Sequence, residues 1–244
     1  MTVEIKNKFK ISIITPSYNQ GDFIEKAIQS VINQGEYQIE HIIIDGDSSD
    51  KTIDILKKYP HLIYISEKDE GQSDALNKGF AMATGDIIGW LNSDDYYEPG
   101  CFDKIIESLN SNRVDAVYGD YRFVDINGNE TRKLITQLPV KWISLFYCFI
   151  PSTTFFFKRK IYDSGIKIDK KIHISMDKEF FAKILFNNFN IKKIDSILAN
   201  FRWHSNNKSI DTNEIKRIRY KEGLMIFNRF SKITLPNNIY GTLV

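Results

Sequence analysis

The chain has 244 residues, a formal net charge of +2 at pH 7, and 42% hydrophobic residues. This composition is typical of a soluble globular protein with one large or two modest domains, and the near-neutral charge gives no indication of a nucleic-acid partner. The two cysteines, Cys101 and Cys148, exclude a disulfide framework and a zinc-ligand pattern, and they fit a reducing compartment.

The sequence shows neither a targeting segment nor a membrane span. Its first ten residues, MTVEIKNKFK, are polar and lack the apolar core of a signal peptide. The longest apolar stretch, residues 143–157, is interrupted at Pro151 and the three hydroxyl residues after it, so it is too short to cross a bilayer. We therefore expect a cytoplasmic protein.

The first 110 residues alternate short apolar runs with segments of helical periodicity. Strands are expected at residues 11–15, 40–44, 62–65 and 86–91. Four helices are expected between and after these strands. The first starts at Asp22, with Glu25 as its capping partner, and the second ends near Tyr59. The third covers residues 74–83, and the fourth begins near Pro99. This alternation predicts an α/β fold with a mostly parallel central sheet flanked by helices.

The pattern changes after residue 114. Strands are expected at 114–124, 153–157, 191–194 and 197–203, with a hairpin turn at Asn127-Gly128 and helices at 176–186 and 214–232. Residues 138–149 fit a helix or an apolar loop equally well. We expect a smaller antiparallel second half within one domain over residues 1–244, divided at about 1–112, 113–212 and 213–244.

Two adjacent acids, Asp94 and Asp95, follow the buried run of the fourth expected strand. Ligands of α/β folds bind at this carboxyl edge of the sheet, and two neighbouring carboxylates need a cation or hydrogen bonds when they are buried. Oxygen ligands of this kind select Mg²⁺ or Mn²⁺. A simple polar turn is an equal alternative for these two residues taken alone, because Asn, Ser and Asp favour turns.

Other expected strands also end in polar residues. Asp45 follows the second strand and could accept hydrogen bonds from a base or a ribose, although helix capping is the alternative. Tyr18, in the loop 15–19, could stack on a base, and a rigid connecting turn competes with that interpretation. Asp177 begins a helix, where a favourable helix-dipole charge is the simpler explanation. His204 closes the last strand, and a lone histidine is more often structural.

The expected C-terminal helix, 214–232, is basic and amphipathic. Such a helix can lie on an anionic membrane surface. It can equally pack on the domain with its basic face in water. The sequence leaves both alternatives open.

Four separated stretches resemble one family in their order and spacing: ISIITPSYN (11–19), IIIDGDSSDKT (42–52), EKDEGQSDALNKG (67–79) and ATGDIIGWLNSDDYY (83–97). They resemble the nucleotide-sugar half of family 2 glycosyltransferases, which are inverting enzymes of the GT-A fold. The stretches SMDKEFF and LANFRWHSNNKS extend the resemblance more loosely into the second half. It implies a GT-A nucleotide-diphospho-sugar transferase fold whose smaller half binds the acceptor.

The resemblance also implies residue roles. The DxD motif of the family falls on Asn92-Ser93-Asp94, so Asp94 would bind Mn²⁺ or Mg²⁺ and through it the donor diphosphate, with Asp95 beside it. Asn92 departs from the acid of the family pattern, and Leu76 stands where many members carry an arginine. The resemblance further implies nucleotide binding at Asn92 and Ser93. The remaining roles are uridine-binding positions at Thr15, Pro16, Tyr18 and Asp45, a nucleotide-lining loop at Asp74, a catalytic base at Asp177, and a metal or diphosphate contact at His204.

The function implied is metal-dependent inverting transfer from a nucleotide-sugar, with UDP-hexose or UDP-N-acetylhexosamine as the expected donor. The acceptor would be a glycan or lipid-linked glycan in surface polysaccharide assembly, with peripheral contact at the inner face of the cell membrane. A non-catalytic nucleotide- or glycan-binding module of the same fold is the alternative. A nucleotidyltransferase would need a glycine-rich basic loop after the first strand, which PSYNQGDF does not supply.

Overall fold

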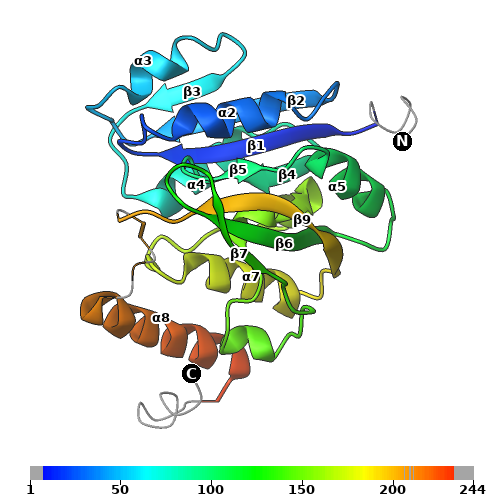
Figure 1. Cartoon of the computed structure of the whole chain (residues 1–244). Helices are drawn as coiled ribbons and strands as arrows, with labels where there is room; N and C mark the ends of the chain where they lie inside the picture. The colour runs from blue at the N-terminus through cyan, green and yellow to red at the C-terminus, as the bar shows by residue number, and fades with distance from the viewer. Residues whose placement is uncertain (1–7, 206, 209, 211, 234–244) are drawn as a thin grey trace.

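The computed structural model describes residues 8–205, 207–208, 210 and 212–233. The strands of this part form one nine-stranded sheet in the order β3-β2-β1-β4-β8-β6-β9-β5, with β7 paired to β6. Figure 1 shows β3 near one end of the molecule and α8 at the other. Both halves of the chain therefore share one continuous sheet.

The first half has the predicted alternation of strands and helices. The strands β1 (Lys10–Ser17), β2 (Gln38–Asp45), β3 (Ile63–Ser66) and β4 (Ile87–Trp90) pair in parallel. They alternate with α2 (Ile24–Ile32), α3 (Thr52–Leu56), α4 (Gln72–Met82) and α5 (Cys101–Leu109). Because the four strands are parallel, the loops after β1, β2 and β4 meet at one edge of the sheet.

The second half is a mixed extension of this sheet. The short strand β8 (Phe156–Lys158) joins it antiparallel to β4 and to β6 (Ala116–Val124), and β9 (Ile191–Arg202) runs parallel to β6. Two strands are antiparallel additions, β5 (Tyr96–Tyr97) on β9 and β7 (Glu130–Leu134) on β6. The helical segments are the 3₁₀ turns Ile143–Leu145 and Ser152–Thr154 and the α-helices α6 (Arg159–Asp163), α7 (Met176–Phe186) and α8 (Asn213–Ser231).

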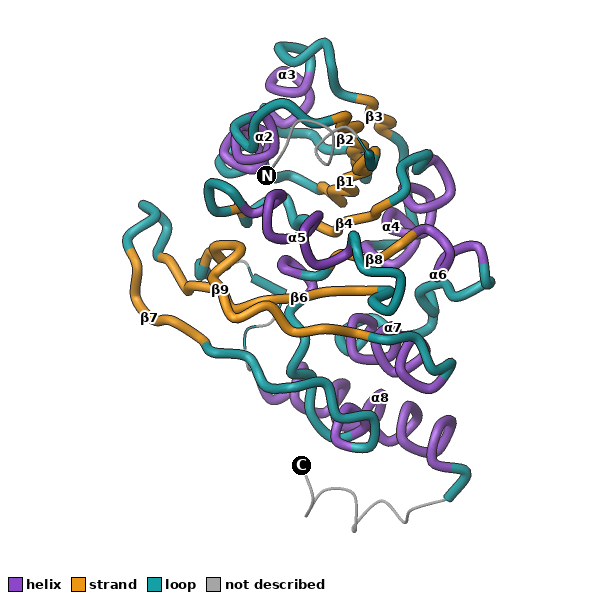
Figure 2. Tube along the Cα trace, turned by 90° about the vertical axis from the view of Figure 1, so that its right-hand side faces the viewer, coloured by secondary structure: helices purple, strands orange, loops and turns teal. Residues whose placement is uncertain are grey.

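Helices cover both faces of the sheet, as Figure 2 shows for α2 and α5 on one side and α4 and α7 on the other. The α4 and α7 side encloses a large apolar cluster in which aromatic rings of the sheet and helices interlock, among them Phe80, Phe157 and Phe180. Helix α8 joins this cluster through Ile226 and Phe227. The apolar side of α8 is therefore packed on the protein. None of the helices that the structure describes has the length and apolar character required to cross a membrane.

Two local predictions are wrong, and one segment that was left open between a helix and a loop is a loop. Asp22 does not cap α2, because its exposed side chain pairs with Lys51 and Phe23 occupies the N-cap position. Residues 138–149, for which a helix and an apolar loop fitted equally well, form a loop with one 3₁₀ turn, and several of their apolar side chains stay exposed. The two short strands expected at 191–203 are the single strand β9, whose register against β6 shifts near Gly119.

The buried side chain of Glu40 connects β1, β2 and the residues just before β4 through hydrogen bonds. Its carboxylate accepts hydrogen bonds from the Ser12 hydroxyl, from the Thr84 hydroxyl at 2.7 Å and from the Gly85 amide at 3.2 Å, and Lys10 Nζ lies 2.7 Å away. Burial alone would raise the pKa of Glu40, but the hydrogen bonds from Lys10, Ser12 and Thr84 lower it to about 2. The ionised form is therefore favoured in the folded protein.

We expect Glu40→Gln to lower the free energy of unfolding by about 1.5–3 kcal/mol at pH 7, because charge-assisted hydrogen bonds are lost. The pKa of Glu40 is lower in the folded chain than its ordinary value of 4.5. Its contribution is therefore complete above pH 4.5 and is lost as the pH falls towards 2. Urea unfolding at several pH values measures this, with exposed Glu36→Gln as the matched control. If the difference in unfolding free energy between the two variants did not decrease in acid, the assignment of an ionised Glu40 would be contradicted.

Candidate active site

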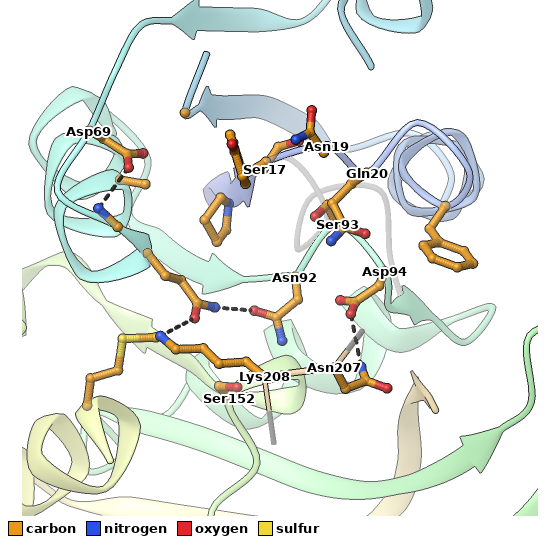
Figure 3. A pocket seen from close by; sticks show the side chains of 18 of the residues that line it. Ser17, Asn19, Gln20, Asp69, Asn92, Ser93, Asp94, Ser152, Asn207 and Lys208 are labelled. Atoms are coloured by element: carbon orange, nitrogen blue, oxygen red, sulfur yellow. Dashed lines mark hydrogen bonds between the residues drawn. The ribbon is translucent and has the colours of Figure 1, made fainter. Parts of the chain in front are cut away.

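A pocket of about 1110 Å³ opens at the carboxyl edge of the parallel strands. The loops after β1, β2 and β4 line it, together with the starts of α4 and α7 and the segment after β9. Figure 3 shows side chains from these segments converging on it. Ligands of open α/β sheets bind at this position, so the pocket is the candidate active site.

Asp94 faces the pocket beside the predicted His204. Its Oδ2 atom lies 3.1 Å from His204 Nε2 and accepts a hydrogen bond of 3.1 Å from Asn207 Nδ2 (Figure 3). The His204 ring stacks on Phe23 with centroids 4.6 Å apart, and Arg202 Nε donates to the backbone oxygen of Asp94. The fold therefore brings together an acid and a histidine that are 110 residues apart in sequence.

Asp95 points into the protein and is only 1% exposed. Its carboxylate accepts hydrogen bonds from Thr153 Oγ1 at 2.6 Å, Asn92 Nδ2 at 3.0 Å and the Arg202 amide at 3.0 Å. Burial and the charge of Asp94 raise the pKa of Asp95 well above its ordinary range. This geometry favours a positioning role for Asp95, and its predicted contact with a metal stays a prediction.

Asn92 links Asp95 to the pocket. Its Oδ1 atom accepts from Trp90 Nε1 at 2.9 Å and from Gln72 Nε2 at 3.0 Å, and its Nδ2 atom donates to Asp95. An aspartate at this position could not donate to Asp95 and would place a second negative charge beside it. The departure from the family pattern at Asn92 therefore has a local physical reason.

The residues around Asp94 offer a small ligand set for a hard divalent cation. Within the described ranges, no group of three or more His, Cys, Asp or Glu side chains could hold a metal. Asp94 and His204 supply one carboxylate and one imidazole. Asn207 turns its amide nitrogen to Asp94, and its amide oxygen accepts from the His204 backbone amide, so this side chain orients the acid and the histidine. Mg²⁺ is commonly held by one or two carboxylates together with waters and substrate phosphates, so a small protein ligand set of this kind suits it.

Asp177 lines the same pocket from the first turn of α7. The backbone amide of Lys178 donates to its Oδ1 atom at 2.7 Å. Burial raises the pKa of Asp177, and hydrogen bonds from the Lys178 amide and the Cys148 thiol lower it only in part. The pocket thus holds a carboxylate that is more basic than an ordinary aspartate.

The residues predicted to bind the nucleotide divide into two groups. Pro16, Tyr18, Asn92 and Ser93 line the pocket, and Tyr18 is 62% exposed. Three others are buried beneath it and held by protein partners, namely Thr15 by His41, Asp45 by Ser48 and Ser66, and Asp74 by Lys170. Their direct contact with a nucleotide stays a prediction.

Several pocket residues were not identified from the sequence. Lys208 Nζ lies 3.4 Å from Gln72 Oε1, which links the segment after β9 to the start of α4 (Figure 3). Asp47, Asp69 and Arg219 also line the pocket. Single polar residues in loops carry no periodicity or spacing signal, so only the fold brings them together.

Comparison with known proteins gives the family. The model of the glycosyl transferase family 2 matches residues 12–177, which is more than half of the chain, and the chain belongs to this family. A Bacillus subtilis protein named as a teichuronic acid biosynthesis glycosyltransferase, TuaG, is 33% identical over 131 residues, which are 51% of this chain and 52% of TuaG. The chain spans about half the length of the curated relatives it matches.

Solved structures confirm the GT-A fold. Staphylococcus aureus TarS 1–349, in complex with UDP-GlcNAc, matches with a TM-score of 0.71 and 17% identity, over 96% of this chain and 70% of that one. The mannosyltransferase PcManGT from Pyrobaculum calidifontis, in complex with GDP-Man and Mn²⁺, matches with a TM-score of 0.69 and 16% identity, over 98% and 69%. At these identities the likeness concerns the fold alone.

We expect Asp95→Asn to lower the free energy of unfolding by about 1–3 kcal/mol, because an amide nitrogen would then face one of the three donors that hold Asp95. Asp94→Asn is the matched control, since it makes the same change on the neighbouring side chain, which is partly exposed in the pocket. Chemical denaturation of the metal-free protein measures both. Equal losses in the two variants would contradict the positioning role of Asp95.

Proposed function

We propose that this family 2 glycosyltransferase transfers a sugar from a nucleotide-sugar, with a UDP-hexose or UDP-N-acetylhexosamine as the expected donor, to a glycan or lipid-linked glycan. One observation carries the proposal: Asp94 with His204, and the basic carboxylate Asp177, line the same pocket. A non-catalytic binding module, the alternative function, would need no carboxylate of raised pKa beside a ligand pocket.

The donor would lie across the loops after β1 and β4. Tyr18 offers an exposed ring on which a base can stack, and Lys208, in the segment after β9, offers a positive charge to the diphosphate. Asp94 and His204 would hold a Mn²⁺ or Mg²⁺ ion, which neutralises charge on the leaving diphosphate when it is bound. The Mn²⁺ in the PcManGT structure supports this ion choice.

Asp177 would act as the general base. As the acceptor hydroxyl attacks the anomeric carbon, the carboxylate takes its proton, and the bond to the diphosphate breaks on the opposite side. This single displacement inverts the anomeric centre. General-base catalysis contributes about 10²–10⁴-fold to the rate, and the raised pKa of Asp177 brings it closer to the operating pH.

The name of TuaG supports a place in polysaccharide synthesis. Membrane contact by α8 is a separate proposal. Residues such as Lys216, Arg217 and Lys221 are exposed on this helix, while its apolar side packs on the protein. Helix α8 could therefore contact an anionic membrane surface only through its charged side.

Asp177→Asn is expected to lower kcat by about 10²–10⁴-fold and to leave the dissociation constant of the donor unchanged, because the base is lost and the donor contacts remain. In the wild type, activity requires the ionised carboxylate, so it falls in acid at a pH above the ordinary aspartate value, since burial raises the pKa. Transfer assays across pH and donor titrations measure both. Asp163→Asn, at an exposed carboxylate, is the control, and normal turnover by Asp177→Asn would contradict the assignment.

Asp94→Ala is expected to abolish metal-dependent binding of UDP, because the carboxylate that would hold the cation is removed. Calorimetric titration of UDP with Mn²⁺, with Mg²⁺ and with excess chelator measures this dependence. Asp22→Ala, at an exposed acid that also lines the pocket, is the control. Tight binding of UDP that is insensitive to both chelator and Asp94→Ala would show that no cation is used.

A further inference from the structure

Four aromatic side chains pack against one another in tilted and edge-to-face contacts on one face of β6 and the end of β9. They are Tyr121 and Phe123 of β6, Phe201 of β9 and Trp203 directly after β9, here called the aromatic platform. Phe123 is central, with ring centroids 5.2 Å from Tyr121, 5.3 Å from Phe201 and 6.2 Å from Trp203. Phe201 and Trp203 are 6.3 Å apart. The register pairs Phe123 with Phe201, so the two strands place these rings together.

The platform is not part of the buried core. None of the three buried apolar clusters in the described part of the chain includes these rings, and Trp203 is 46% exposed. The alternate residues of the two strands point the other way, where Arg122 and Asn200 bind Glu98. Strand alternation therefore leaves a row of aromatic rings on the outward face, which core packing does not require.

The platform is continuous with the candidate active site. Phe201 lines the pocket together with Asp177. Tyr121 lies close enough to the catalytic region for the negative charges of Asp95 and Asp177 to add to the effect of burial, which raises the pKa of Tyr121 to about 12. The row of rings thus leads from the proposed base towards exposed Trp203.

We propose that the aromatic platform binds the pyranose rings of the acceptor glycan and so presents the reacting hydroxyl to Asp177. Pyranose rings have apolar C–H faces that pack on aromatic rings, and hydroxyl edges that stay in water. A narrow row of partly exposed rings suits this shape. The guanidinium of Arg132 lies over the Phe123 ring, 4.5 Å from its centroid, so at this ring it offers a polar donor to the hydroxyl edges of the sugar. The inference rests on the proposed transfer reaction, because it names where that acceptor binds.

Binding of defined glycans to Trp203 variants tests the proposal. The probes are cellohexaose, chitohexaose and a chondroitin hexasaccharide, each titrated into the full chain by calorimetry and by saturation-transfer NMR. We expect at least one probe to bind the wild type, and Trp203→Ala to weaken its affinity about tenfold or more. Trp203→Phe keeps an aromatic face and should restore most of the affinity. Trp142→Ala, which removes a tryptophan that is 56% exposed in the loop after β7, should leave it unchanged.

Three outcomes would overturn the proposal. The first is that no probe binds the wild type, and the second is that binding survives Trp203→Ala. The third is that Trp203→Ala changes the oligomeric mass measured by light scattering, which would mean that the platform joins two copies of the chain. Titration of UDP with Mn²⁺ into the same variants separates this proposal from the transfer reaction. Trp203→Ala should bind UDP normally. A wild type that binds a glycan but no nucleotide would refute the transferase function and leave the platform in place.

Discussion

The hydrogen bonds to the buried carboxylate of Asp95 are the constraint on which the site depends. They join the end of β4, through Asn92, to the turn 152–154, through Thr153, and to the end of β9, through the Arg202 amide. These segments come from both halves of the chain. By fixing them against one another, Asp95 holds its neighbour Asp94 opposite His204, so a buried acid that faces away from the pocket determines what the pocket presents.

The parallel half of the fold was predictable because its signals are local. Apolar runs such as residues 40–44, each followed by helical periodicity, identify the strands and their order. The mixed half was less predictable, since β5 has two residues and β8 has three, too few for a period to be recognised. The capping prediction at Asp22 was wrong because a tertiary ion pair with Lys51 replaced the local hydrogen bond.

The site was predictable to the extent that it lies at strand ends. Asp94, Tyr18 and Asp177 line the pocket as expected from the motifs. Asp45 was expected to accept hydrogen bonds from a base or a ribose, yet Ser48 and Ser66 donate to its oxygens. Lys208 gave no signal, because its importance comes from the path of the chain after β9. A sequence does not show which polar atoms already have hydrogen-bond partners within the folded protein.

The alternation of side chains along β9 affects how this strand can change through evolution. It carries Phe201 on the outward face and Arg202 on the inward face, and His204 follows directly after it. Because side chains alternate along a strand, a gain or loss of one residue would exchange the two faces and displace the histidine as well. A substitution in β9 changes one side chain on one face, whereas a change in its length after the register shift near Gly119 displaces the side chains of both faces at once.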